Sequence, residues 1–308
     1  MIEGRNAPYT FFNHFKSIIM QIIKAQRKQA VIKMALQGPS GSGKTYSSLL
    51  LAYGLTGNWD HIAVVDTENN SSHLYSHLGN FNVLSLSEPF TPERYIEAIG
   101  ICEKAGMKAV IIDSISQEWE GNGGILETHG NMTGNSFTNW NKVTPRHNGF
   151  VQKMLQSPCH IVATIRSKQD YVLTDKNGKM VPEKVGLKGV TRDGMDYEFT
   201  LVLDLDIKHQ ATASKDRTGL FSNPLPFLIT ESTGGRIKTW CMGEDLIKHI
   251  EEQVANARTT QELSNILTKY PSLRDKVEPL CFKRKQELEG VIADTDVESP
   301  KLNDHGTG

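Results

Sequence analysis

Residues 38–45 read GPSGSGKT, which fits the phosphate-binding pattern GxxxxGK[ST]. The apolar run 31–36 before them predicts a strand, and residues 45–53 after them predict a buried helix that ends near Gly54. Glycines in such a loop let backbone N–H groups turn toward phosphate oxygens, and the start of the helix adds positive potential. Together the three segments predict a binding site for a nucleoside triphosphate.

Lys44 and Thr45 carry the chemistry of this loop. In the pattern, the lysine binds and stabilises the β- and γ-phosphates, and the threonine hydroxyl binds Mg²⁺. Residues 141–144 read NKVT and lack the aspartate of a guanine-specificity motif, so we expect ATP rather than GTP. The loop residues expected to contact ATP are Gly38, Pro39, Ser40, Gly41, Ser42, Gly43, Lys44, Thr45 and Tyr46.

A second metal partner is predicted at the end of another apolar run. Asp113 closes residues 108–113, and we expect its carboxylate to hold Mg²⁺ through water beside Thr45. The next residue is Ser114 rather than a glutamate that could polarise water. The catalytic base must therefore lie elsewhere in the chain.

Glu68 is the candidate for that base. It comes two residues after the apolar run that ends at Asp66, which would place it at the carboxyl edge of a parallel sheet, where such folds carry their chemistry. Glu118 and Glu120 remain alternative candidates because they follow the strand that ends at Asp113.

Elements that could position these residues alternate along the chain. Near-continuous apolar runs separated by helices indicate parallel strands buried on both faces, and the later part reads as hairpins with Asn177-Gly178 at one tip. We therefore predict an α/β fold with a mostly parallel central sheet and an antiparallel extension. Further predicted strands are 61–66, 81–86, 199–205, 210–213 and 227–230, and a helix is predicted at 91–105.

Four regions are predicted from these patterns. Residues 1–30 form an amphipathic helical extension, and residues 31–242 form the nucleotide-binding core. Helices return in residues 243–290 as a small C-terminal module, and the acidic tail 291–308 reads as disordered.

Composition limits the classes of function. The net charge of −1 over 308 residues argues against a polycation, so contact with nucleic acid must come from local patches. The four cysteines form no CxxC pair, which fits a reducing cytoplasm. No stretch reaches the roughly 18 apolar residues of a membrane span, so we expect a cytoplasmic protein without a membrane partner.

Several of these segments resemble RecA-like ATPases. Residues 38–45, 64–68 and 110–114 are similar to the family's Walker A loop, the strand with its catalytic glutamate, and its Walker B strand. The resemblance assigns the base to Glu68. It also makes Thr164 the counterpart of the γ-phosphate sensor, although bacterial recombinases carry glutamine there.

A further match concerns residues 214–219, which read SKDRTG and resemble a segment that reaches into the neighbouring subunit's nucleotide. The resemblance implies that Lys215 and Arg217 act in catalysis from an adjacent subunit. It thus implies self-association into a ring or filament, with ATP hydrolysed between subunits.

The closer likeness is to phage-encoded RecA-like ATPases of the Sak group, which are linked to single-strand annealing and recombination. It rests on residues 28–33, 113–116, 144–148 and 213–219. It implies a Mg²⁺-dependent ATPase that acts on single-stranded DNA in the bacterial host cytoplasm, with a single-strand-binding protein or another recombination protein as partner. A nucleotide-dependent switch, loader or motor subunit that acts on a protein partner remains the alternative.

Two segments could contact a single strand. Residues 164–192 contain seven basic and three acidic residues, although a solvated charged hairpin would look the same. The other segment combines the glycines of 121–124 with Trp119, Phe137 and Trp140, and its alternative is that the tryptophans pack the domain.

Overall fold

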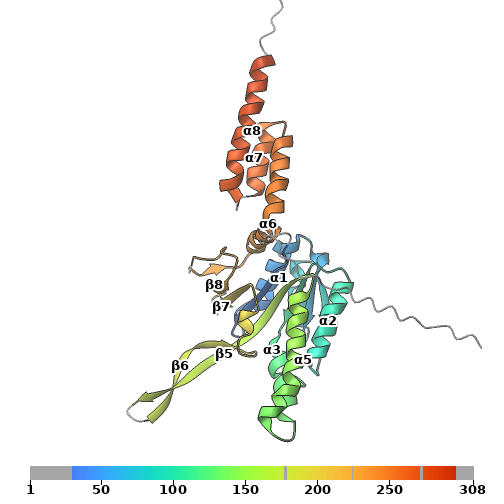
Figure 1. Ribbon diagram of the computed structural model, residues 1–308, viewed down its shortest axis with the longest axis vertical. Helices are drawn as coiled ribbons and strands as arrows, with labels where there is room; N and C mark the ends of the chain where they lie inside the picture. Colours follow the sequence, from blue (N-terminus) through green and yellow to red (C-terminus); the bar gives the residue numbers. More distant parts are fainter. Residues whose placement is uncertain (1–29, 177–178, 224, 271–272, 296–308) are drawn as a thin grey trace, which may run out of the picture.

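The computed structural model describes residues 30–176, 179–223, 225–270 and 273–295. The predicted N-terminal extension, the Asn177-Gly178 tip and most of the acidic tail lie outside the described residues. Among the described ones, a single large sheet carries the fold, and the ribbon of β5 and β6 projects from the body (Figure 1). Its strands lie in the order β3-β2-β4-β5-β1-β7-β8-β9, with β6 paired to β5.

The centre of the sheet is parallel. Its strands β1, β2, β3, β4, the first part of β5, and β7 pair in parallel. Helical segments connect most of them, as parallel pairing requires, whereas the chain reaches β7 through an antiparallel strand. The bounds are β1 (Lys33–Gly38), β2 (Ile62–Asp66), β3 (Asn82–Ser85), β4 (Ala109–Asp113), β5 (His160–Lys176) and β7 (Leu201–Leu205).

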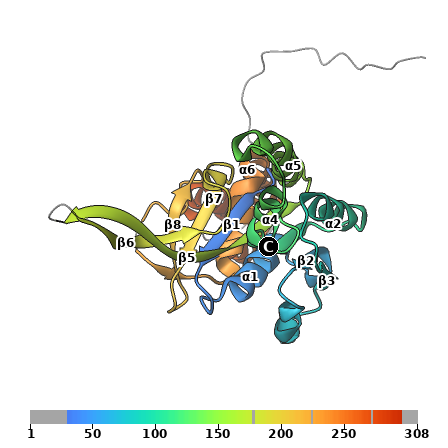
Figure 2. The ribbon, with the colours of Figure 1, turned by 90° about the horizontal axis from the view of Figure 1, so that it is seen from below.

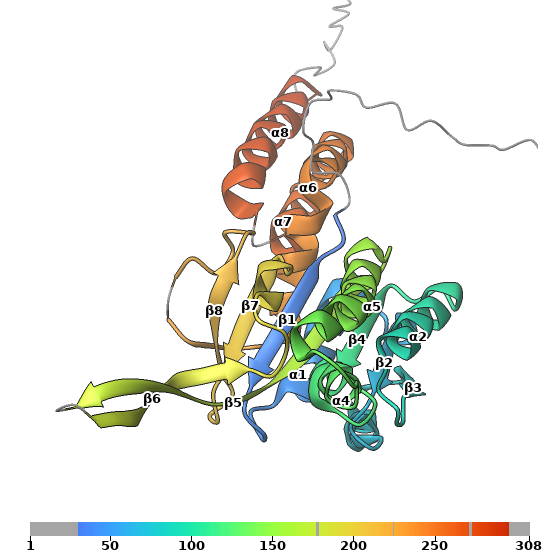
Figure 3. The same ribbon diagram turned by 60° about the horizontal axis from the view of Figure 1, so that its bottom comes forward.

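Helices cover both faces of this parallel region (Figure 3). Alternate residues of the central strands enter opposite apolar clusters, so that Ile111 packs on the side of α1 and α6, and Ile112 on the side of α2 and α5. The uninterrupted apolar runs arise from this burial on both faces. The helices are α1 (Lys44–Thr56), α2 (Pro92–Lys104), α5 (Ser136–Gln156) and α6 (Glu231–Asn256).

Antiparallel strands extend the sheet at β7, where β8 (Gln210–Asp216) and then β9 (Phe227–Leu228) pair in turn. β5 also continues past the sheet and pairs with β6 (Lys179–Gly189) as a two-stranded ribbon that projects from the body (Figure 2). These features confirm the predicted α/β class with a mostly parallel sheet and an antiparallel extension.

Short helices fill the connections, and several of them border the carboxyl edge of the sheet. They are η1 (Trp59–His61), η2 (Ser71–Leu78), α3 (Ser116–Glu120), α4 (Ile125–Gly130) and η3 (Met195–Tyr197). Among the residues that the structure describes, none of the helices combines the length and the apolar character needed to cross a bilayer.

The C-terminal helices form a second, smaller apolar cluster. α6 bends at Gly243 (φ 56°), and its second half packs on α7 (Thr260–Lys269) and α8 (Arg274–Thr295). The first half of α6 lies against α1 instead. α6 starts at Glu231, twelve residues before the predicted start at 243, because Thr230 and Thr233 form a reciprocal capping box there. The Gly-Gly pair that follows has low helix propensity, which hides this start in the sequence.

Candidate functional site

The glycine-rich loop between β1 and α1 has the backbone that phosphate binding requires. Gly41 (φ 79°) and Gly43 (φ 84°) lie in the left-handed region, where a side chain would be strained. Gly43 precedes α1 and offers no side chain to cap the helix, which leaves first-turn N–H groups for an anionic ligand. Ser42 Oγ is buried and has no hydrogen-bond partner among the described residues, so the loop retains capacity for one more polar contact.

A pocket of about 1080 Å³ opens beside this loop, at the carboxyl edge of the parallel strands. We call it the nucleotide pocket, and its volume is in the range of sites that hold a cofactor. The predicted site residues that line it are Ser40, Gly41, Gly43, Lys44, Thr45, Tyr46, Glu68 and Asp113; those outside its lining are Gly38, Pro39, Ser42, Thr164, Lys215 and Arg217.

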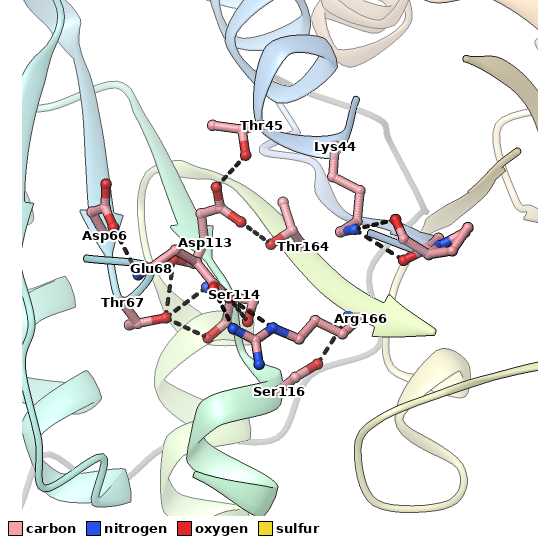
Figure 4. A network of polar contacts seen from close by, with 12 residues as sticks. Lys44, Thr45, Asp66, Thr67, Glu68, Asp113, Ser114, Ser116, Thr164 and Arg166 are labelled. Carbon is pink, nitrogen blue, oxygen red and sulfur yellow. Dashed lines mark hydrogen bonds and ion pairs between the residues drawn. The ribbon is translucent and has the colours of Figure 1, made fainter. Parts of the chain in front are cut away.

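Lys44 is held at the rim of the loop. Its ammonium donates to the carbonyl oxygens of Gly38 and Pro39, both at 2.9 Å (Figure 4). Burial lowers the pKa of Lys44, and the nearby carboxylate of Asp113 opposes that effect. A phosphate group could therefore replace weak carbonyl partners with a charged one.

Asp113, at the end of β4, is nearly fully buried and held by two hydroxyl groups (Figure 4). Thr45 Oγ1 donates to Oδ2 at 2.5 Å, and Thr164 Oγ1 donates to Oδ1. Burial raises the pKa of Asp113, while both hydroxyl contacts lower it. The oxygen ligands of Thr45 and Asp113 at the pocket fit Mg²⁺, whereas Thr164 is fully buried and contacts the carboxylate rather than the pocket.

Glu68 is fixed by its own turn, by Ser114 just after β4, and by Arg166 of β5. Asp66 accepts hydrogen bonds from the N–H groups of Glu68 and Ser72, both at 2.8 Å, which orders the segment after β2. The Glu68 carboxylate accepts from Ser114 Oγ at 2.9 Å and forms a two-pronged ion pair with Arg166 of β5 (Figure 4). Glu68 and Asp113 thus lie in the same pocket as Lys44.

The sequence pattern does not show the role of Arg166. It is one of the seven basic residues of the segment 164–192, but its guanidinium binds Glu68 and lines the nucleotide pocket. A signal existed in the alternation of β5, since Thr164, Arg166 and Lys168 share one face of the strand. Which acids they meet depends on the strand order, which the sequence does not show.

His209 also belongs to the site, and no pattern in the sequence indicates it. It lines the nucleotide pocket from the turn between β7 and β8 and has a positive φ of 63°. A Cβ placed on Gly43 would lie 3.0 Å from its Nδ1, so the imidazole sits directly over the loop.

The two alternative glutamates lie in different places. Glu118 is buried and accepts a hydrogen bond from His147 Nδ1 at 3.0 Å; burial raises its pKa, and it does not line the nucleotide pocket. Glu120 lines that pocket and forms an ion pair with Lys168 at 3.1 Å.

Lys215 and Arg217 lie on and just beyond the end of β8, away from the nucleotide pocket of the same chain. Lys215 donates to the carbonyl oxygens of Asp196 at 2.8 Å and Tyr197 at 2.5 Å, and Arg217 donates to Tyr197 O at 3.3 Å. Arg217 is exposed.

The two segments predicted to contact a single strand meet in a second pocket of about 510 Å³, which we call the aromatic pocket. Trp119 and Trp140 stack with ring centroids 6.0 Å apart, and His129 stacks on Trp140 at 4.1 Å. The basic residues that line the aromatic pocket are Lys168, Lys188 and Arg192, and the acidic ones are Glu120 and Asp193. The two pockets share a wall, because Glu120, Lys168 and Val190 also line the nucleotide pocket.

A match to a known protein family covers the larger part of the chain. A family model described as an AAA domain matches residues 30–227, a span that begins before β1 and ends in β9. None of the curated proteins matches the chain. The matched span contains the phosphate-binding loop, Glu68 and Asp113, whereas α6, α7 and α8 lie beyond it.

Proposed function

Because this chain belongs to the AAA domain family of P-loop ATPases, and because the glycine-rich loop, Glu68 and Asp113 line one pocket, we propose that it hydrolyses ATP with Mg²⁺. The proposal rests on the fact that these groups line the same pocket. Lys44 would bind the phosphates, Thr45 and Asp113 would hold the metal, and Glu68 would orient the attacking water and accept its proton. Mg²⁺, when bound, neutralises charge that develops on the phosphate oxygens.

Residues beyond the loop would position the rest of the nucleotide. Tyr46 and Tyr75 have ring centroids 6.0 Å apart and both line the pocket, and Leu228 and Ile229 line it as well. These aromatic and aliphatic surfaces suit a purine base, while the loop and Lys44 suit the triphosphate.

The test of ATP hydrolysis compares the wild-type chain with Lys44→Ala. The variant should lose nucleotide binding in a titration with a fluorescent ATP analogue and lose phosphate release. Lys142→Ala changes an exposed lysine of α5 outside the nucleotide pocket and should leave both unchanged. Equal affinity of Lys44→Ala and wild type would contradict the proposed nucleotide site.

We further propose that ATP hydrolysis serves a reaction on single-stranded DNA, as in phage-type recombination or annealing. The aromatic pocket supports the DNA part, since stacked tryptophans suit unpaired bases and lysines suit phosphates. The recombination context rests on the resemblance to the Sak group. Lys168 and Lys188 are paired with Glu120 and Asp193, so we expect modest affinity with a shallow salt dependence.

Binding of a labelled deoxythymidine oligonucleotide, measured by anisotropy at several salt concentrations, tests the DNA part. Trp140→Ala should weaken binding by removing a stacking surface worth about 1–3 kcal/mol. Phe282→Ala removes an aromatic ring that is 61% exposed on α8 and lies outside the pocket and both predicted segments, so it serves as the matched control. Equal loss in both variants, or no loss in Trp140→Ala, would argue against this surface.

We also propose that subunits associate and share the ATPase site. Lys215 and Arg217 support this idea because they lie near the surface, outside the nucleotide pocket of their own chain. A single-strand-binding or other recombination protein remains a proposed partner, and a cytoplasmic location remains part of the same proposal.

The second candidate is a nucleotide-dependent switch, loader or motor that acts on a protein. The C-terminal module favours it, because the module lies beyond the matched span and Phe282 of α8 is 61% exposed. In that case single-stranded DNA would leave the ATPase rate unchanged, which a rate measurement with and without the oligonucleotide decides.

A further inference from the structure

β5 carries a row of polar side chains that joins the two pockets. Thr164, Arg166 and Lys168 are alternate residues and so share one face of the strand. Each contacts an acidic residue of another element: Thr164 binds Asp113, Arg166 binds Glu68, and Lys168 binds Glu120. The row runs from the metal ligand to the wall that the nucleotide and aromatic pockets share.

The Glu68 carboxylate is largely occupied by these contacts. Oε1 accepts from Ser114 Oγ and from Arg166 Nε, both at 2.9 Å, and Oε2 accepts from a terminal nitrogen of the same guanidinium. An ionised carboxylate has about four acceptor positions, and these three contacts leave one of them, on Oε2, for a water molecule. The two-pronged pair also turns both oxygens toward Arg166, so release from Arg166 would free the carboxylate to reorient toward the nucleotide.

Thr164 cannot couple DNA binding in the aromatic pocket to the ATPase site, because its short side chain does not reach either pocket. It is fully buried, its hydroxyl is bound to Asp113, and it lines neither pocket. Arg166 and Lys168 are 40% and 70% exposed, so both can change partners by rotation of their side chains.

The two ion pairs are neighbours. Residues two apart on one face of a strand are about 6.6 Å apart, and Lys168 holds the Glu120 carboxylate beside that face at 3.1 Å. Arg166 and Glu120 both line the nucleotide pocket. If Lys168 were drawn to another anion, the freed Glu120 would compete with Glu68 for Arg166.

We propose that Arg166 is a positioning residue that restrains Glu68, and that a phosphodiester group in the aromatic pocket removes the restraint by exchange of ion-pair partners. The phosphate binds Lys168, Glu120 takes Arg166, and Glu68 is released toward the nucleotide. This relay rests on the proposed function, and it gives DNA-stimulated hydrolysis a route through Arg166 rather than through Thr164.

The experiment measures ATP turnover with and without a deoxythymidine oligonucleotide. Arg166→Gln should raise turnover without DNA by about tenfold, because a freed general base contributes at least that much, and should bring the stimulation factor close to one. Lys168→Gln should also raise turnover without DNA, since it frees Glu120. Arg166→Lys, which keeps the charge without the two-pronged contact, should fall between wild type and Arg166→Gln.

Two further variants make the result specific. Arg166→Gln combined with Glu68→Gln should lose the gain, because the effect acts through Glu68. Arg146→Gln breaks a two-pronged pair with Glu93 of the same geometry, at 2.7 and 2.8 Å but away from both pockets, and should leave turnover and stimulation unchanged.

Failures of the relay and of the proposed function are distinguishable. If wild-type turnover does not exceed that of Lys44→Ala, the ATPase proposal fails. If the wild type hydrolyses ATP but Lys168→Gln shows no gain, or Arg166→Gln loses turnover in both conditions, the relay is overturned alone. A wild-type turnover that the oligonucleotide does not increase would also overturn the relay. It would indicate that the γ-phosphate of ATP, and not a DNA strand, frees Glu68.

Discussion

Carboxylates at the nucleotide pocket differ in the partners that hold them. Asp113 is buried between two threonine hydroxyls, whereas Glu68 is one-quarter exposed and bound to an arginine. A metal ligand benefits from a fixed position, and a base must exchange partners during turnover. The different surroundings thus fit the different roles proposed for the two residues.

Glu68→Gln should keep ATP affinity and lower single-turnover hydrolysis by about 10²–10⁴-fold, the usual contribution of a general base. Quenched-flow measurement with labelled ATP gives both quantities. Glu97→Gln, an exposed glutamate of α2, is the control and should behave as wild type. Undiminished hydrolysis in Glu68→Gln would move the role to Glu120, which lines the same pocket.

His160 gives a pH dependence of stability that is independent of the ATPase. Its Nδ1 accepts a hydrogen bond from the Ile32 N–H at 3.1 Å, and burial lowers the pKa of His160 from 6.5 to about 4, with Lys33 and Lys238 adding to the effect. Between these pH values the unfolded chain binds the proton and the folded chain does not. The contribution of His160 to the free energy of unfolding should therefore be complete above pH 6.5. It should be lost as the pH falls toward 4, by up to about 3 kcal/mol.

Urea denaturation across that pH range tests this prediction. His160→Gln can still accept the Ile32 N–H bond but cannot titrate, so its stability should fall less with acid than that of the wild type. His77→Gln changes an exposed histidine and should keep the wild-type slope. Parallel curves for wild type and His160→Gln would contradict the assigned cause.

The crossing of α1 and α6 depends on two glycines that face each other. A Cβ on Gly54 would lie 2.1 Å from the carbonyl oxygen of Glu231, and one on Gly234 would lie 2.3 Å from that of Leu51. The obstacles are backbone atoms, which cannot rotate away. The two helices therefore approach more closely than side chains would permit, and α6 supports the helix that follows the glycine-rich loop.

Gly54→Ala should lower the free energy of unfolding by about 1–3 kcal/mol, as overpacking does. Gly100→Ala is the matched control, because Gly100 is also inside a helix but has open space around it. It should raise the free energy of unfolding by about 0.5–1 kcal/mol. Guanidinium denaturation of both variants checks the opposite signs, and equal effects would contradict the packing argument.

The elements differ in how far sequence could predict them. The strands at 108–113 and 61–66 and the loop at 38–45 were predictable, because burial on both faces and phosphate binding leave local patterns. α5 was not predicted, since Pro145 lies inside it and its first turns are polar. The Glu68–Arg166 pair joins residues 98 positions apart, and only the order β2-β4-β5 brings them together.

The proposed assembly makes its own prediction. Arg217→Ala and Lys44→Ala should each abolish hydrolysis, but a mixture should regain part of it. An intact phosphate loop from one variant can then meet an intact Arg217 from the other. A mixture of Lys44→Ala with the Lys44→Ala/Arg217→Ala double variant is the control and should stay inactive. Absence of recovery at every mixing ratio would argue that Arg217 does not act between subunits.

α6 belongs to two apolar clusters at once, one on each side of the bend at Gly243. Its first half contributes Ile237 beside Leu51 of α1, and its second half contributes Ile250 to the terminal bundle. A force applied to that bundle, by a tethered partner or by an adjacent copy, would thus pass through the bend at Gly243 to the first half of α6, which packs on the helix that follows the glycine-rich loop. The stiffness of the backbone at Gly243 would determine how much of that force reaches α1.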